Sequence, residues 1–360
     1  MENFSCKTQI YTGEGSLSCL GEMNIRRLFL VTDPYFMENG MAQKLLSLSG
    51  AAHKEIFHKV TPDPSVDLAA EATASLKTFE PDTVVALGGG SVMDLAKAAL
   101  YFSKTQASFV AVPTTSGSGS EVTDFAILTH GNVKHPLVDT ALCPQVAILD
   151  SALLQSLPKG LIADTGFDVL SHALESYVAK NATAFTRALS REAFSVAFAL
   201  LPASYQGDTE VRGRIHEAAT MAGIAFTRGG LGLCHGLAHA LGGAFHLPHG
   251  RLNAILLPAV IDCNAHACAN LYATLARSAG LPGAADTLAV RNLKNALCRL
   301  RRELGMPQNL KEAGVDPREV WRRTPQLVAD TLADPCCATN PMAVADFMVK
   351  KVLEEVTGRV

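Results

Sequence analysis

Five residues in the middle of the chain carry side chains that bind divalent metals. Asp168 and His172 are four residues apart, His235 and His239 repeat that spacing, and His249 follows them. Side chains four residues apart share one face of a helix, and a carboxylate with several imidazoles is a ligand set for a first-row divalent ion. The pattern predicts a catalytic metal held on helices.

The residues around these histidines disfavour two kinds of zinc protein. A zincin protease carries Glu directly after its first helical histidine as general base, whereas Gly236 follows His235. The nine cysteines contain no Cys-x-x-Cys pair, and Cys336 and Cys337 are adjacent, so a zinc ribbon is not expected. A metal-dependent hydrolase of another type stays open as an alternative.

A glycine-rich loop precedes these residues in the chain. Gly88, Gly89, Gly90 and Ser91 follow an apolar run and open a helical segment, so their backbone N–H groups could hold a diphosphate at the helix N-terminus. Met93 stands where the usual dinucleotide fingerprint has its third glycine. The loop predicts a dinucleotide cofactor, with a tight turn that binds no ligand as the alternative.

Two further features support a dinucleotide. The segment 113–121 is rich in hydroxyl groups and follows the next apolar run, so it could contact ribose, nicotinamide or diphosphate. Asp33 follows the apolar run 26–32, where a carboxylate accepts the ribose hydroxyls of adenosine and repels the 2′-phosphate of NADP. Asp33 is also a suitable helix N-cap. Together with the glycine loop it favours NAD.

The secondary-structure pattern changes near Pro158 and predicts two domains. Before it, short apolar runs alternate with the helical segments 67–79 and 92–103, which favours an α/β domain with a mostly parallel sheet over 1–158. After it, helical periodicity dominates, which predicts a helical metal-binding domain over 159–360. A cleft between the two is the expected place for a shared site. The expected strands are 26–32, 53–60, 82–88, 107–114 and 145–150, and the expected later helices are 160–180, 184–204, 208–226, 232–244, 250–278 and 286–304.

Composition narrows the class of protein. The 360 residues are 48% hydrophobic and 18% charged, with a net charge of -3, which suits a globular enzyme and gives no basic footprint for nucleic acid. No uninterrupted apolar run reaches the roughly 18 residues that span a bilayer, and no secretory signal is visible at the start. We therefore expect a cytoplasmic protein that binds neither membrane nor nucleic acid.

Four linked motifs resemble the iron-containing (group III) alcohol dehydrogenases. They are GGGSVMDLAKA (88–98), PTTSGSGSEVT (113–123), DTGFDVLSHALESYV (164–178) and CHGLAHALGGAFHLPHG (234–250), and the likeness extends over nearly the whole chain. The resemblance implies that the fold is that of this family and of dehydroquinate synthase, with a dinucleotide-binding domain and a helical metal-binding domain. It also implies NAD(H)-linked interconversion of aldehydes and primary alcohols.

The resemblance assigns roles to individual residues. Asp168, His172, His235 and His249 would bind Fe(II), or Zn(II) as the alternative, whereas His239 would lie beside nicotinamide and substrate as the catalytic histidine. Phe125, Phe226 and Leu231 would line the substrate pocket. The cofactor would contact Asp33, Gly88, Gly89, Gly90, Ser91, Thr114, Thr115, Ser118 and Lys134. Ala240 departs from the proline that is common there in the family, and no ligand changes with it.

Within the family, the residues 4–17, 60–64 and 245–250 are similar to the branch that reduces propionaldehyde in bacterial microcompartments. The resemblance therefore implies propionaldehyde or acetaldehyde as substrate, a homodimer or higher homo-oligomer, and shell or enzyme partners in a microcompartment. The alternatives are a glycerol dehydrogenase-like enzyme, a dehydroquinate synthase-like lyase, a metal-dependent hydrolase and a non-catalytic shell-associated protein.

Overall fold

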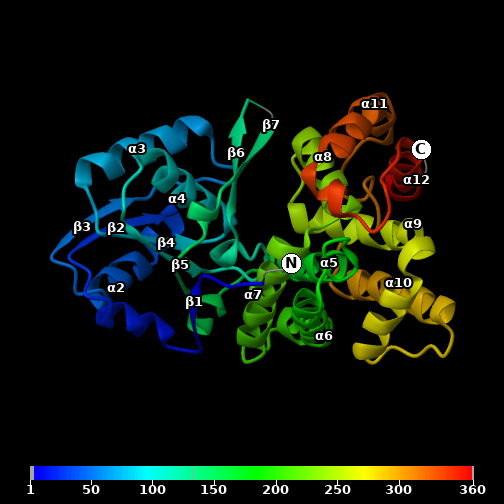
Figure 1. Ribbon diagram of the computed structural model, residues 1–360, viewed down its shortest axis with the longest axis horizontal. Coiled ribbons are helices and arrows are strands. Elements are labelled where there is room, and N and C mark those ends of the chain that lie inside the picture. The colour runs from blue at the N-terminus through cyan, green and yellow to red at the C-terminus, as the bar shows by residue number, and fades with distance from the viewer. Residues whose placement is uncertain (1–3, 132, 359–360) are drawn as a thin grey trace. The chain divides into compact units, whose positions relative to one another are not determined.

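The computed structural model describes residues 4–131 and 133–358. It consists of two compact units, Met1–Leu157 and Pro158–Val360, coloured blue to green and green to red in Figure 1. The first contains a sheet covered by helices, and the second is helical. The expected fold class, an α/β domain followed by an all-α domain, is confirmed.

The main sheet of the first unit has six strands and is entirely parallel. Its strand order is β1-β8-β5-β4-β2-β3, and every neighbouring pair is parallel. Five of the strands lie in the expected runs, and β1 was not expected. The strands are β1 (Gln9–Thr12), β2 (Arg27–Thr32), β3 (His53–Phe57), β4 (Thr83–Gly88), β5 (Ser108–Pro113) and β8 (Val146–Leu149).

Both faces of this sheet are buried, which explains why its central strands are apolar without alternation. Phe29 and Val31 pack with α3 (Val66–Phe79) and α4 (Gly90–Ser103). Leu28 and Leu30 point to the other face and pack with η1 (Ser16–Glu22), α1 (Pro34–Glu38) and α2 (Met41–Leu48). At its carboxyl end β4 leads into α4 through Gly89 alone, so the two packed elements fix the position of this turn.

A hairpin that the sequence analysis did not predict follows β5. Strands β6 (Phe125–His130) and β7 (Val133–Val138) pair antiparallel, and Figure 1 shows them standing apart from the main sheet. Pro136 lies within β7, and a proline within a run normally argues against a strand. Three short helices complete this unit: η2 (Ser120–Val122), η3 (Thr140–Leu142) and η4 (Ser151–Leu154).

The second unit confirms the six expected helices and adds α11, α12 and η5. Its last two helices have large apolar faces that pack on α8 and α9. The elements are α5 (Lys159–Val178), α6 (Ala184–Gln206), α7 (Arg212–Gly229), α8 (Leu233–Phe245), α9 (His249–Ser278), α10 (Asp286–Glu303), α11 (Pro317–Ala333), η5 (Pro335–Thr339) and α12 (Asp346–Thr357).

One helix among the described residues, α9, is long and apolar enough by length and composition to cross a membrane. Polar residues such as Arg251, Asn253 and Asp262 interrupt its sequence, so it contains no uninterrupted apolar run of about 18 residues. In the structure 72% of its apolar window is buried, because α9 packs against α5 and α10. This burial is typical of the central helix of a globular unit.

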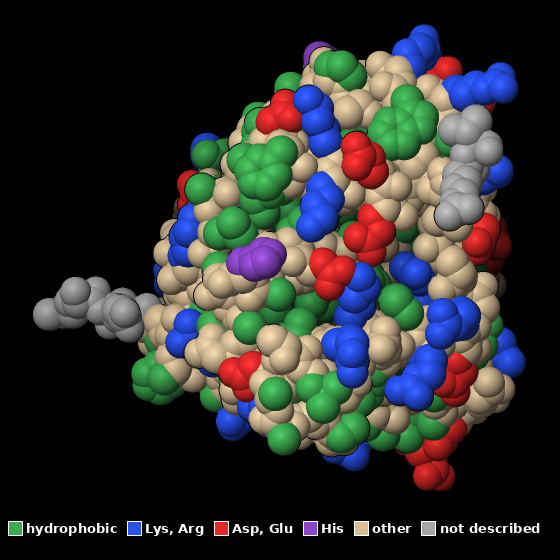
Figure 2. Space-filling view, turned by 90° about the vertical axis from the view of Figure 1, so that its right-hand side faces the viewer, with side chains coloured by type: hydrophobic (Ala, Val, Ile, Leu, Met, Phe, Trp, Pro, Cys, Tyr) green, Lys and Arg blue, Asp and Glu red, His purple; other side chains and the backbone are tan. Residues whose placement is uncertain are grey.

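Charged side chains of both signs are mixed among the described residues on the face shown in Figure 2. Exposed ion pairs of the second unit include Lys350 with Asp346 and Arg323 with Glu319. Such pairs typically contribute less than about 1 kcal/mol each to the free energy of unfolding. We therefore attribute the stability of this unit to its buried helix faces.

Candidate metal and cofactor site

Three helices of the second unit present the metal-binding side chains. Asp168 and His172 lie one turn apart on α5, whose residues from 166 to 178 are all buried. His235 lies in the first turn of α8, and His249 is the first residue of α9. Because α5 packs against both of the other helices, residues far apart in the sequence meet at one point.

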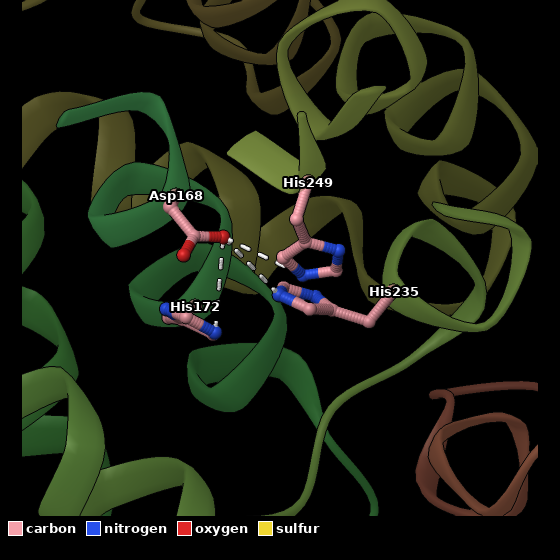
Figure 3. A group of neighbouring side chains, drawn as sticks. All are labelled: Asp168, His172, His235 and His249. Atoms are coloured by element: carbon pink, nitrogen blue, oxygen red, sulfur yellow. Dashed lines mark ion pairs between the residues drawn. The ribbon is translucent and has the colours of Figure 1, made fainter. Parts of the chain in front are cut away.

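The four side chains converge (Figure 3), and one donor atom from each lies within 4.8 Å of the others, so together they could hold a metal ion. From Asp168 Oδ1, the Nε2 atoms of His172, His235 and His249 lie at 3.9, 3.9 and 3.6 Å. A tetrahedral ion with bonds of about 2.1 Å requires donors about 3.4 Å apart. The residues therefore fit a first-row divalent ion after small shifts.

The chemistry of His235 also suits a metal ligand. Burial, and then the neighbouring imidazoles, hold the pKa of His235 well below its ordinary value. The ring is therefore neutral near pH 7, which is the form that binds a metal.

Buried side chains that the sequence analysis missed hold these ligands in place. Glu175 Oε2 lies within hydrogen-bond distance of His235 Nδ1, at 2.7 Å, and burial raises the pKa of Glu175 to about 7. Asn253 Nδ2 donates to Asp168 Oδ1 at 2.9 Å. One signal could have revealed both: Glu175 is seven residues after Asp168 and Asn253 four after His249, spacings that repeat one helix face.

His239 lies beside the four ligands but faces a different partner. Its ring stacks on that of His249, with centroids 5.1 Å apart, and its Nδ1 lies 2.8 Å from Asp334 Oδ2. Asp334 is the last residue before η5, and the sequence analysis did not single it out. His239 is absent from the group formed by the four donors and forms a second one with Asp334 and Cys336.

The three proposed substrate residues fall in different units. Phe226 stacks on His172 with centroids 4.5 Å apart, and Leu231 is buried just before α8. Phe125 begins β6 in the first unit. Phe226 therefore places apolar surface against a metal ligand, and the roles of Leu231 and Phe125 in a substrate pocket stay predictions.

The glycine loop and the hydroxyl-rich loop of the first unit lie against each other. The N–H group of Thr114 donates to Gly88 O at 3.1 Å. A Cβ atom on Gly89 would lie 3.3 Å from Thr115 Oγ1, and one on Gly90 would lie 3.3 Å from Ser118 Oγ. Because Gly90 and Ser91 begin α4, both loops meet at a helix N-terminus, which suits an anionic diphosphate.

A buried lysine of α4 donates hydrogen bonds to the segment 120–125, which extends from the end of the hydroxyl-rich loop. Lys97 is completely buried, and its Nζ donates to Ser120 Oγ, Thr123 O, Thr123 Oγ1 and Phe125 O at 2.9 to 3.0 Å. Burial lowers its pKa to about 8. Lys97 was not singled out from the sequence, because nothing in the sequence pairs it with residues 23 or more positions away.

Asp33 and Lys134 have defined contacts in the same unit. Asp33 caps α1 by accepting from Phe36 N at 3.3 Å, as an N-cap would, and burial raises its pKa. Lys134 lies on β7, and its Nζ is 2.6 Å from Asp63 Oδ1. Their contacts with a nucleotide stay predictions.

Comparison with known proteins supports the same assignment. The family model of the iron-containing alcohol dehydrogenases matches residues 7–151, and the model of the C-terminal part of that family matches residues 162–357. The chain is 38% identical to the 1-propanol dehydrogenase PduQ of Citrobacter freundii, covering 99% of this chain and all of the relative. It is 35% identical to the NADPH-dependent butanol dehydrogenase of Clostridium saccharobutylicum, covering 98% and 97%.

A solved structure has the same fold. It is the sulfoacetaldehyde reductase of Bifidobacterium kashiwanohense in complex with NAD+, with a TM-score of 0.90 and 26% identity over 99% of this chain and 98% of that one. The two family matches together extend from residue 7 to residue 357, which confirms the expected family and its likeness to 1-propanol dehydrogenases. The chain belongs to the iron-containing alcohol dehydrogenase family.

Proposed function

We propose that the chain is a metal-dependent, NAD(H)-linked alcohol dehydrogenase that interconverts short-chain aldehydes and primary alcohols. The observation that carries the proposal is the group of three imidazole Nε2 atoms around Asp168 Oδ1, at 3.6 to 3.9 Å. A hydrolase would explain this group, but it leaves the glycine loop against Thr115 and Ser118 without a purpose.

Different residues would bind the metal, exchange the proton and bind the cofactor. Asp168, His172, His235 and His249 would hold Fe(II), with Zn(II) as the alternative. When bound, the ion would polarise the substrate oxygen while the nicotinamide donates or accepts hydride. His239 would exchange a proton at Nε2, because its Nδ1 faces Asp334. The loops at Gly89 and Thr115 would bind the cofactor diphosphate and the groups beside it.

NAD(H) is the cofactor that we propose. The carboxylate of Asp33, at the end of β2, would accept the adenosine ribose hydroxyls and repel a 2′-phosphate. One relative is named NADPH-dependent and one related structure holds NAD+, so cofactor choice varies in the family and a direct measurement is required.

Short, unbranched aldehydes are the proposed substrates, with propionaldehyde and acetaldehyde preferred. The stacking of Phe226 on His172 supports an apolar wall beside the metal ligands, and the buried Leu231 would add to it. A methylene group on such a wall contributes about 1 kcal/mol until the space is filled. A homo-oligomer in the cytoplasm or in a bacterial microcompartment is supported by the family resemblance alone.

Oxidation of NADH by the purified, iron-loaded protein tests this function. Stoichiometric conversion of propionaldehyde to 1-propanol is expected, with lower kcat/KM for bulky aromatic aldehydes. The His235→Ala protein is the control for contaminating reductases. Hydrolytic activity without NADH oxidation would contradict the proposal. A higher kcat/KM for the oxidation of glycerol than for the oxidation of 1-propanol would indicate a glycerol dehydrogenase-like enzyme instead.

A further inference from the structure

Glu175 is a buried carboxylate one turn beyond the metal ligands of α5. It is 2% exposed, and it lies three residues after His172, so the two side chains share a helix face. A buried carboxylate is costly unless hydrogen bonds satisfy both of its oxygens. The partners of Glu175 therefore indicate what it does.

Among the described residues, the hydrogen-bond partners of Glu175 all belong to the segment 232–235, which carries His235. Oε1 accepts from Cys234 N at 2.7 Å, and Oε2 accepts from Gly232 N at 3.0 Å and His235 N at 3.2 Å. These are N–H groups at the start of α8, which have no partner within the helix. One carboxylate thus holds the first turn of the helix.

The same carboxylate also fixes the ring of His235. Oε2 lies 2.7 Å from His235 Nδ1, while Nε2 faces Asp168 Oδ1 at 3.9 Å. A carboxylate favours the tautomer with its proton on Nδ1, where it accepts the hydrogen bond, and this leaves the lone pair of Nε2 free on the side of Asp168, His172 and His249. The close approach requires glycine at 232, because a Cβ atom there would lie 2.8 Å from Glu175 Oε1.

We propose that Glu175 is a positioning residue for the metal, which sets metal affinity by fixing both the tautomer and the position of His235. The inference rests on the metal site of the proposed function but not on the reaction. In protein metal sites such a carboxylate typically contributes 10- to 100-fold to metal affinity.

Asn340, which follows η5, provides a matched control because its side chain contacts the same first turn of α8. Its Oδ1 accepts from Leu233 N at 3.1 Å, and the side chain is completely buried. Asn340 therefore also holds the start of α8, but within the described part of the chain its side chain hydrogen-bonds to Leu233, Asn264 and Met342 and to no imidazole. A purely structural role for Glu175 would make the two residues equivalent.

The test measures metal binding by the full chain. Wild type, Glu175→Gln, Glu175→Asp and Asn340→Ala are titrated with Co²⁺, read by visible absorption, and with Zn²⁺ in competition with a chromophoric chelator. Gln keeps the size of the side chain but must turn an NH₂ group toward N–H donors. Asp keeps the charge but is one methylene too short to reach Nδ1.

We expect Glu175→Gln and Glu175→Asp to weaken Co²⁺ and Zn²⁺ binding 10- to 100-fold and to change the Co²⁺ spectrum. Asn340→Ala should lower the melting temperature while the metal Kd stays within about threefold of wild type. Unchanged metal affinity in a folded Glu175→Gln protein, or an equal loss in Asn340→Ala, would overturn the inference. If the Gln and Asp variants both fail to fold, the ¹⁵N chemical shift of His235 Nδ1 is measured in the metal-bound wild type between pH 6 and pH 8. A shift that stays at the value of a protonated Nδ1 supports the fixed tautomer. A shift typical of a mixture of tautomers overturns the inference.

The outcome is separable from that of the proposed function. A wild type that binds Co²⁺ but oxidises no NADH with any aldehyde would refute the function and leave this inference intact. A wild type that reduces propionaldehyde, with Glu175 variants that bind metal normally, would refute this inference alone.

Discussion

His239 Nδ1 lies 2.8 Å from Asp334 Oδ2, between residues 95 positions apart in the chain. Burial by itself would raise the pKa of Asp334, but the hydrogen bond and charge of His239, with the N–H group of Cys336, keep that pKa below its ordinary value. The carboxylate therefore orients the ring and leaves Nε2 as the atom that can exchange a proton.

The first prediction separates His239 from the metal ligands. His239→Ala should keep its metal content, while kcat falls roughly 10²- to 10⁴-fold and its pH dependence changes, because a general acid–base group is lost. Metal analysis and the pH profile of kcat check this. Asp334→Ala should also lower kcat, and a double variant with both substitutions should have nearly the same kcat as His239→Ala. A metal-depleted His239→Ala protein would show that His239 is a ligand.

The second prediction concerns the ligands themselves. His235→Ala removes one of four donors, and the remaining donors cannot complete the metal shell, so metal content and turnover should fall together. His266→Ala is the control, because this histidine is exposed on α9 and lies outside the metal group. A His235→Ala protein with full metal content and normal turnover would refute the assignment.

The third prediction concerns cofactor choice. Wild type should have a higher kcat/KM with NADH than with NADPH. Asp33→Gly should reduce the ratio of these two values, because it removes a negative charge near the 2′ position of the adenosine ribose. Asp33→Asn is the control: it keeps an N-cap for α1 and lacks the charge. Measured kcat/KM values for both cofactors decide. Preference of the wild type for NADPH would be incompatible with the role given to Asp33.

The fourth prediction concerns pH and Lys97. Its folded pKa of about 8 lies below the ordinary value of 10.5, so between these pH values the unfolded chain binds more protons than the folded one. The contribution of Lys97 to the free energy of unfolding should therefore increase as pH rises from 8 to 10. Urea unfolding of wild type and Lys97→Met checks the difference between them. A difference that is constant or decreases between these pH values would show that burial does not lower the pKa of Lys97.

The fifth prediction concerns the contact of α9 with α5. A Cβ atom on Gly250 would lie 1.9 Å from Asp164 O, a backbone atom that has little freedom to move. Gly250→Ala should lower the free energy of unfolding by at least about 1–3 kcal/mol and weaken metal binding at the adjacent His249. Gly242→Ala is the control, since its Cβ would meet Leu252 Cδ1 at 3.5 Å, an ordinary contact. Thermal unfolding that ranks the two variants the other way would contradict the packing argument.

Much of the fold follows from local sequence. Strands buried on both faces leave continuous apolar runs, and long helices leave a period of 3.6 residues, so five strands and eight helices lie where these patterns predict them. The β6–β7 hairpin and helices α11 and α12 were missed. In the hairpin the reason is physical: the apolar run of β6 is only four residues long (125–128), and Pro136 interrupts β7.

The chemical nature of the site was also determined by the sequence, because residue type and a four-residue spacing suffice to place a carboxylate and imidazoles on helix faces. Spacing alone could not separate His235 from His239, which repeat the same pattern on α8. Tertiary packing decided that one ring faces Asp168 and Glu175 and the other faces Asp334. These partners come from other helices and from the segment after α11, and such long-range contacts leave no periodic signal in the chain.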